Sequence, residues 1–195
     1  MRVSTIERNS HETKIKMTLN LDGSGRANIQ TGVGFVDHML ELFAFHGQFD
    51  LEVKCDGDIH VDSHHSVEDL GIVLGDCILE ALGDKKGIYR YGFFKIPMDE
   101  VLFETVLDIS GRAFLVYNAQ LNTPVLGNYE TEMTEEFFRA VAMHAGITLH
   151  LNEIYGNNTH HVIEAMFKSF ARALKQAVTI DEKNKDRVVS SKGIL

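Results

Sequence analysis

Three pieces of this sequence occur twice in the same order, and this internal duplication is the feature that most constrains the fold. The strongest match has six of seven residues identical. The matching pieces are residues 21–27 (LDGSGRA) with 107–113 (LDISGRA) at an offset of 86, residues 37–40 (DHML) with 135–138 (EEFF) at an offset of 98, and residues 64–68 (HHSVE) with 160–164 (HHVIE) at an offset of 96. Three matches in order indicate two homologous halves. We predict halves at residues 1–86 and 87–180, followed by a C-terminal tail at 181–195.

Hydrophobic patterning predicts similar elements in the two halves. Residues 14–21 alternate between apolar and polar side chains, as a half-buried strand does, and the turn-forming residues 22–25 predict a hairpin with a return strand at 26–30. Apolar residues at helical spacing predict helices at 33–45 and 63–82, around a strand at 49–53. The second half predicts strands near 88–96, 100–109, 112–119 and 147–153, and helices near 131–145 and 159–178. These elements predict an α+β fold with two small, mainly antiparallel sheets, each covered by two helices.

Composition excludes several classes of protein. Nineteen Lys and Arg against twenty-eight Asp and Glu give a net charge of −9, which argues against a nucleic-acid surface because such a surface is basic. No run of 18 apolar residues and no apolar leader is present, so we expect a cytoplasmic protein without a membrane partner. Cys55 and Cys77 match no metal-ligand spacing and are expected to be free thiols.

The sharpest local motif is His-His-x-x-Glu, which opens a predicted helix in each half. Residues four apart lie on one helix face, so His64 with Glu68, and His160 with Glu164, can each hold one ion. The neighbouring His65 is rotated by about 100° from His64 and is expected to serve another ion, as is His161 in the second half. A ligand set of nitrogen and oxygen without thiolate favours Mn, Fe or Zn.

The duplication proposes further ligands, because His38 and Glu136 occupy equivalent positions in the two halves. We predict one site from His38, His64 and Glu68 with a borrowed His161, and a second site from Glu136, His160 and Glu164 with a borrowed His65. Ligands borrowed between motifs predict that the chain forms a homo-oligomer.

Longer strings in the chain resemble the imidazoleglycerol-phosphate dehydratase family of histidine biosynthesis, over essentially the whole length. The strings that carry the resemblance are TGVGFVDHML (31–40), DSHHSVED (62–69), PMDE (97–100), DISGR (108–112), NTHHVIEA (158–165) and SSKG (190–193). The resemblance implies a ribosomal protein S5 domain 2-like fold. The phosphatase domain that some members carry in addition is not expected at this length.

The resemblance implies a hydro-lyase that dehydrates D-erythro-imidazole-glycerol phosphate to imidazole-acetol phosphate. It also implies two Mn²⁺ per active site and a shell of 24 subunits with sites at subunit interfaces, while Fe and Zn stay open as alternatives. The implied metal ligands are His38, His64, His65, Glu68, His160, His161 and Glu164, to which the repeat adds Glu136. Two positions depart from the family pattern, since many members have His in place of Glu136 and Gln in place of Leu42.

Substrate contacts and catalytic groups also follow from the resemblance. The implied substrate contacts are Glu12, Arg90, Arg112, Lys168, Ser190, Ser191 and Lys192, of which the basic and hydroxyl side chains suit a phosphate. The tail is expected to close over that phosphate. Proton transfer needs carboxylates, and the candidates are Glu12, Glu68, Asp99 and Glu164, with roles left open. We expect an imidazolate or diazafulvene-like intermediate, held by two metal ions.

Two other functions fit the same residues. A binuclear metallohydrolase acting on a phosphoester would use a metal-bound water and need no imidazole specificity. A non-enzymatic metal-binding shell protein would take up many ions per chain and catalyse no reaction.

Overall fold

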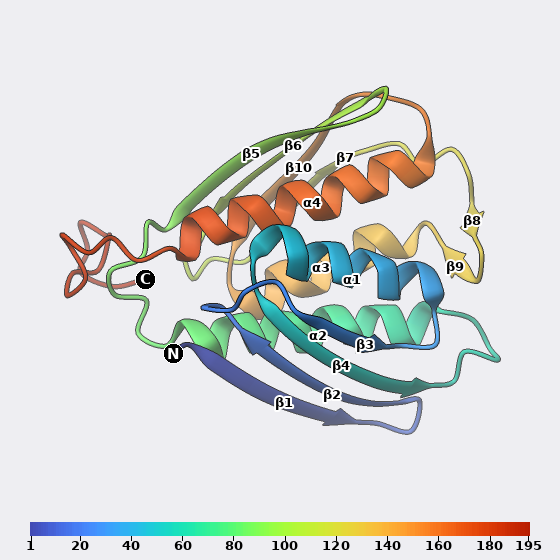
Figure 1. Cartoon of the computed structure of the whole chain (residues 1–195), viewed down its shortest axis with the longest axis horizontal. Coiled ribbons are helices and arrows are strands. Elements are labelled where there is room, and N and C mark those ends of the chain that lie inside the picture. Colours follow the sequence, from blue (N-terminus) through green and yellow to red (C-terminus); the bar gives the residue numbers. More distant parts are fainter.

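The computed structural model of the chain describes residues 1–195 and has two four-stranded sheets with four helices between them (Figure 1). The elements of the first half are β1 (Val3–Asn9), β2 (Thr13–Asn20), β3 (Ala27–Gln30), α1 (Gly34–Gly47), β4 (Asp50–Gly57) and α2 (His64–Leu82). Those of the second half are β5 (Tyr91–Met98), β6 (Val101–Asp108), β7 (Phe114–Asn118), β8 (Val125–Leu126), β9 (Tyr129–Glu130), α3 (Met133–Ala145), β10 (Thr148–Tyr155) and α4 (Thr159–Val178).

The two sheets have the same topology, with strand orders β1-β2-β4-β3 and β5-β6-β10-β7. Each is antiparallel except for its last strand, since β3 pairs in parallel with β4 and β7 with β10. Alternate residues of β2 are buried, as expected for a sheet that has helices on one face and solvent on the other. The predicted α+β class, with mainly antiparallel sheets and two helices on each, is confirmed.

The predicted hairpin between residues 14–21 and 26–30 is wrong, because β4 lies between these two strands. The partner of β2 on its other side is β1, an N-terminal strand that the sequence pattern did not predict. Residues 22–25 form no hairpin turn with β2 because they turn around Asp50, whose Oδ1 accepts hydrogen bonds from the backbone N–H groups of Ser24 and Arg26. A Cβ atom at Gly23 would lie 2.2 Å from the Asp50 backbone nitrogen, so this approach requires glycine.

The strand pairing also corrects the register of the duplication. Leu19 pairs with Leu51, and Leu107 pairs with Leu149, so the equivalent strands differ by 107 − 19 = 88 positions. The offset of 86 between the two LDxSGRA segments is therefore displaced by two residues from the structural equivalence. Residue 12 corresponds to residue 100, and residue 13 to residue 101, in the register that the strands set.

The halves share one core, which is a single cluster of 48 buried residues drawn from both sheets and all four helices. Helices from different halves pack in pairs, α1 on α4 and α2 on α3. One close approach is at Gly71 of α2, where an added Cβ atom would lie 2.6 Å from the carbonyl oxygen of Phe137 on α3. None of the helices combines the length and the apolar character needed to cross a membrane.

Substitution of Gly71 by Ala tests this helix contact. In an open helix Gly→Ala adds about 1 kcal/mol of stability, but here the methyl group meets backbone, and overpacking costs about 1 to 3 kcal/mol. We expect a lower urea midpoint for Gly71→Ala at fixed protein concentration.

The matched control is Gly34→Ala in the first turn of α1, where nothing lies within 4 Å of the added atom. This variant is expected to be as stable as the parent or slightly more stable. A Gly71→Ala protein as stable as the Gly34→Ala protein would contradict the close packing of α2 on α3.

Candidate metal centre

Both His-His-x-x-Glu motifs lie at one end of the molecule, because α2 and α4 begin at the same end and run to the other (Figure 1). A side-chain hydrogen bond stabilises the N-terminal end of each of these helices. The Glu130 carboxylate accepts a hydrogen bond from Ser63 Oγ just before α2, and the Asn158 side chain accepts one from the His161 backbone N–H at the start of α4. The histidines therefore project from ordered first turns rather than from loose loops.

His38, His160 and Glu164 form one cluster in which the three ligand atoms lie within 4.8 Å of one another. His160 Nε2 is 3.2 Å from Glu164 Oε2, and His38 Nε2 is 3.9 Å from the same oxygen. His38 comes from α1 and the other two from α4, so the packing of α1 on α4 builds the cluster.

The cluster fits a divalent cation. Ligand atoms bound to one ion at about 2.1 Å lie roughly 3 to 4.2 Å apart, and both nitrogen–oxygen distances fall within this range. Two imidazoles and a carboxylate leave coordination positions for further ligands. The residues present therefore suit Mn²⁺, Fe²⁺ or Zn²⁺ equally well by ligand type.

Lys168 sets the ionisation of the buried Glu164. Burial by itself would raise the pKa of this carboxyl, but the hydrogen bond and the charge of Lys168, together with His38 and His160, outweigh burial and hold its pKa below the ordinary value. Lys168 Nζ lies 2.5 Å from Glu164 Oε1. Because Oε1 faces the lysine and Oε2 faces the two histidines, Glu164 presents an ionised oxygen to the cluster.

The first half holds the equivalent groups in a more open arrangement. His64 Nε2 is 3.5 Å from Glu68 Oε2, and both side chains are nearly half exposed. Glu136 occupies the position on α3 that His38 occupies on α1, but its Oε2 lies 3.4 Å from Arg139 Nε along the same helix. The duplication makes Glu136, His64 and Glu68 the equivalents of His38, His160 and Glu164.

The predicted grouping of ligands within one chain is therefore wrong. The sequence interpretation put His38 with His64 and Glu68, whereas His38 lies with His160 and Glu164. The reason is that α1 packs on the helix of the other half, α4, and not on α2. Repeat positions identify equivalent residues, but they do not say which half each residue faces.

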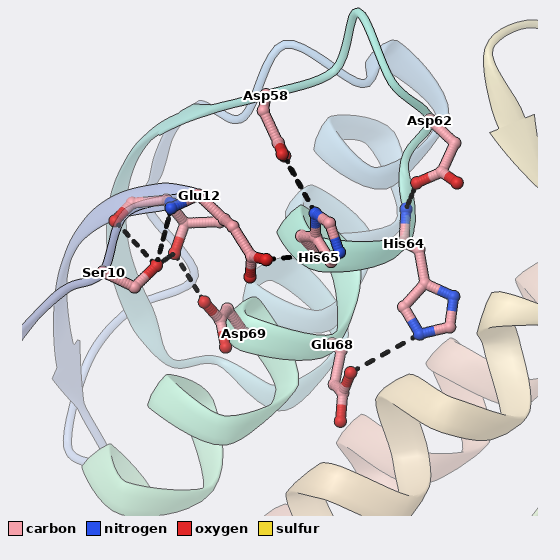
Figure 2. A network of polar contacts seen from close by, with 9 residues as sticks. Ser10, Glu12, Asp58, Asp62, His64, His65, Glu68 and Asp69 are labelled. Atoms are coloured by element: carbon pink, nitrogen blue, oxygen red, sulfur yellow. Dashed lines mark hydrogen bonds and ion pairs between the residues drawn. The ribbon is translucent and has the colours of Figure 1, made fainter.

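The second histidine of each motif lies between carboxylates, as Figure 2 shows for His65. His65 Nδ1 is 3.0 Å from Asp58 Oδ2, and this hydrogen bond raises the pKa of His65. His161 Nδ1 is 2.9 Å from Glu100 Oε2, and the same kind of contact lowers the pKa of Glu100. A carboxylate on Nδ1 fixes the ring and leaves Nε2 to act as a ligand.

Asp58 and Glu100 are functional candidates that the sequence analysis missed. Glu100 adjoins Asp99 in a string that the resemblance had already singled out, whereas Asp58 had no signal. The predicted catalytic carboxylates Glu12 and Asp99 lie on the other side of the same rings. Glu12 Oε1 is 3.6 Å from His65 Nε2, and Asp99 Oδ2 is 3.7 Å from His161 Nε2.

The C-terminal tail lies at the other end of the molecule. It lines a cavity of about 610 Å³ with residues 88–91, and Ser190 and Ser191 are among its walls. Arg90 anchors the tail, since its Nη1 donates to the Val189 carbonyl while Nε and Nη2 hold Asp108 at 2.7 and 3.1 Å. Arg90 is thus largely committed to protein groups.

Arg112 is less engaged with protein groups than Arg90. Its side chain is 70% exposed, and its Nη2 lies 3.7 Å from Asp108, the partner of Arg90. Lys192 is exposed and follows the two serines, with its backbone N–H donating to Ser190 Oγ. The predicted substrate contacts therefore separate into two groups, because Glu12 and Lys168 lie at the metal end and the others at the tail end.

Known proteins that resemble this chain identify its family. The family model for imidazoleglycerol-phosphate dehydratase matches residues 31–174. The chain belongs to the imidazoleglycerol-phosphate dehydratase family. It is therefore an enzyme of the hydro-lyase class with a role in histidine biosynthesis.

Relatives and solved structures agree over nearly the whole chain. It is 60% identical to the imidazoleglycerol-phosphate dehydratase of Lactococcus lactis subsp. cremoris strain SK11, covering 100% of this chain and 98% of that protein. A crystal structure of the Staphylococcus aureus dehydratase matches with a TM-score of 0.84 at 45% identity, over 92% of this chain and 99% of that one. The dehydratase of Pyrococcus furiosus in complex with (S)-C348 matches with a TM-score of 0.83 at 30% identity, over 97% and 100%.

Leu42, where many family members have Gln, lies against the hydrophobic core of this enzyme. It offers no hydrogen bond to a ligand. The departure at Glu136 differs in kind, because a carboxylate is still able to bind a metal ion.

Substitution of His38 or His160 by Ala tests the metal cluster. Each removes one of two imidazoles from a three-residue set, so we expect loss of tight Mn²⁺ binding at one site per chain. The measurement is the metal content after dialysis against a fixed Mn²⁺ concentration. The matched control is His150→Ala on β10, outside the cluster, which should keep the parent stoichiometry. Equal metal content in all four proteins would show that the cluster is not a metal site.

Proposed function

We propose that this enzyme dehydrates D-erythro-imidazole-glycerol phosphate to imidazole-acetol phosphate in the cytoplasm, with two divalent cations, Mn²⁺ first among them. The observation that carries the proposal is the cluster of His38, His160 and Glu164 in a chain of this family. Its nitrogen and oxygen ligands suit a cation that must itself bind an imidazole ring, because the coordination positions left open can accept ring nitrogens.

The cations would be held by two equivalent sets of side chains, one from each half. The first set is His38, His160 and Glu164, and the second is Glu136, His64 and Glu68, with His65 and His161 available through Nε2 to complete sets on a neighbouring subunit. When bound, the two metal ions supply Lewis acidity at the ring nitrogens and so stabilise negative charge that develops on the imidazole.

The protein's own carboxylates have to move protons. The hydroxyl group on the carbon next to the ring leaves as water once it is protonated, and the following carbon, which keeps its own hydroxyl group, loses its proton, so that an enol forms. The enol product then becomes the ketone. Glu164 is held ionised by Lys168 and suits a ligand better than a proton donor. Glu12 is half exposed beside His65 Nε2, so we assign proton transfer to its carboxylate, with Asp99 as the carboxylate that lies at the Nε2 edge of His161.

The phosphate of the substrate would bind at the tail. The Arg112 guanidinium can donate two parallel hydrogen bonds to a phosphate, and Lys192 supplies a positive charge. Ser190 and Ser191 supply hydroxyl donors. Arg90 contributes mainly by holding the tail through the Val189 carbonyl.

Distance within one chain supports an active site shared between subunits. The Arg90 backbone N–H donates to the Ala177 carbonyl near the end of α4, whereas Glu164 lies near its start. These positions are 177 − 164 = 13 residues apart, or about 20 Å along the helix at 1.5 Å per residue. The substrate has only three carbons between ring and phosphate, at about 1.5 Å per bond. One chain's metal cluster and tail cannot both reach it, so we propose a homo-oligomer in which different chains supply the two ends. Its size of 24 subunits is what the resemblance to the family implies.

Incubation of the Mn²⁺-loaded enzyme with imidazole-glycerol phosphate tests the activity. We expect the ketone product to form, and removal of the metal with a chelator to abolish it. Release of inorganic phosphate without ketone would favour a metallohydrolase. Uptake of many ions per chain without any reaction would favour a metal-storage shell. The metal-free enzyme is the control for the uncatalysed reaction.

Mixing two inactive variants tests the shared site. Glu12→Gln impairs the metal end and Arg112→Gln impairs the phosphate end, so each oligomer alone should have little activity. After dissociation and reassembly together in equal amounts, random pairing gives intact sites from two different chains in about a quarter of cases. We therefore expect roughly a quarter of the parent activity.

The control for this mixing is Glu12→Gln reassembled with the double variant that carries Glu12→Gln and Arg112→Gln. That mixture contains no intact metal end and should stay inactive. No recovery in the first mixture, with assembly shown by size-exclusion chromatography, would contradict a site shared between chains.

A further inference from the structure

We infer that Asp69 is a positioning residue: its buried carboxylate holds the β1–β2 turn so that Glu12 faces the Nε2 edge of His65. The inference rests on the proton-transfer role proposed for Glu12. Asp69 belongs to α2 and follows His65 by four residues, so it lies on the same helix face as that histidine. It does not reach the metal cluster itself.

Asp69 is 8% exposed, and both of its carboxylate oxygens are engaged by the first hairpin. Thr13 Oγ1 donates to Oδ2 at 2.5 Å, and Arg8 Nε donates to Oδ1 at 2.9 Å. Arg8 is on β1 and Thr13 begins β2, so the carboxylate ties the last part of one strand and the first residue of the next to α2.

The turn between these strands carries Glu12, and Ser10 organises it. Ser10 Oγ accepts hydrogen bonds from the backbone N–H groups of Glu12 and Thr13, at 3.1 and 3.0 Å. The same hydroxyl lies 3.2 Å from Thr13 Oγ1. Figure 2 shows the resulting chain of contacts from Asp69 to the turn, with the Glu12 side chain directed at His65.

The second half provides an internal comparison in which the network is absent. The strand offset of 88 puts Ile96, Met98 and Val101 in place of Arg8, Ser10 and Thr13, and the helix offset of 96 puts Ala165 in place of Asp69. A buried carboxylate costs desolvation free energy, and the apolar version shows that the fold does not need one here. The polar version therefore serves the turn.

The two turns hold their carboxylates differently. Glu100, which corresponds to Glu12, contacts His161 at Nδ1, the edge that orients the ring. In the first half Asp58 occupies Nδ1, and Glu12 lies at Nε2 instead. The network of Arg8, Asp69 and Thr13 thus accompanies the turn in which the carboxylate at the position of Glu12 faces Nε2. In the other turn the residue at that position contacts Nδ1, and the preceding residue, Asp99, lies at Nε2 instead.

Asp69→Asn and Thr13→Val test the inference in the Mn²⁺-loaded oligomer. A misplacement of about 1 Å costs up to 100-fold in rate, so we expect kcat to fall roughly 10- to 100-fold, with KM and metal content close to the parent. Thr13→Ser keeps the hydroxyl and should restore most of kcat. Glu7→Gln removes an exposed ion pair to Lys16 in the same hairpin and is the matched control, with parent kcat.

A double-mutant cycle separates positioning from a general structural effect. In the Glu12→Gln background, Thr13→Val should lower kcat no further, because the group it positions is already gone. A parent-like kcat for Asp69→Asn, or an equal further loss in the Glu12→Gln background, would overturn the inference. If Glu12→Gln itself keeps full activity, the role proposed for Glu12 falls, and the inference falls with it. If Glu12→Gln is inactive while Asp69→Asn is active, only the inference falls.

Discussion

The four helices lie between the two sheets and pack across the halves, α1 on α4 and α2 on α3, so neither half completes its core or its ligand cluster alone. This packing puts His38 of the first half beside His160 and Glu164 of the second. Lys168, one helical turn beyond Glu164, then keeps the carboxylate ionised. The candidate metal cluster thus depends on a contact between helices that are far apart in the sequence.

The two copies keep the same fold but differ in chemistry. His38 corresponds to Glu136, and the polar set of Arg8, Thr13 and Asp69 corresponds to apolar residues in the second half. The fold accommodates these changes because the buried faces of the strands and helices fix its packing. Side chains at the helix starts and turns lie outside that packing and can therefore differ between the two halves.

Local patterns allowed much of the fold to be predicted from the sequence. The helix at 159–178 has a repeating apolar face and an Asn cap, both of which are local, and its bounds match α4. The pairing of β3 with β4 was missed because the turn at residues 22–25 wraps around the Asp50 side chain. The hydrogen bond from the Ser24 backbone N–H to Asp50 Oδ1 forms only in the folded chain. Spacing alone placed His160 with Glu164, but His38 was assigned to the wrong partner, since sequence does not tell which helix α1 covers. Asp69 ends the string at 62–69 that resembles the family, but it was given no role, because a buried acidic residue and an exposed one look alike in a sequence.

Anomalous diffraction at the manganese edge, from crystals of the Mn²⁺-loaded oligomer, shows where the metal ions bind. We expect an anomalous peak between His38, His160 and Glu164 of one chain, with a further histidine ligand from a neighbouring chain. We expect a second peak at the equivalent residues His64, Glu68 and Glu136. Ions held by protein ligands from one chain only, or peaks away from both sets of residues, would contradict this expectation.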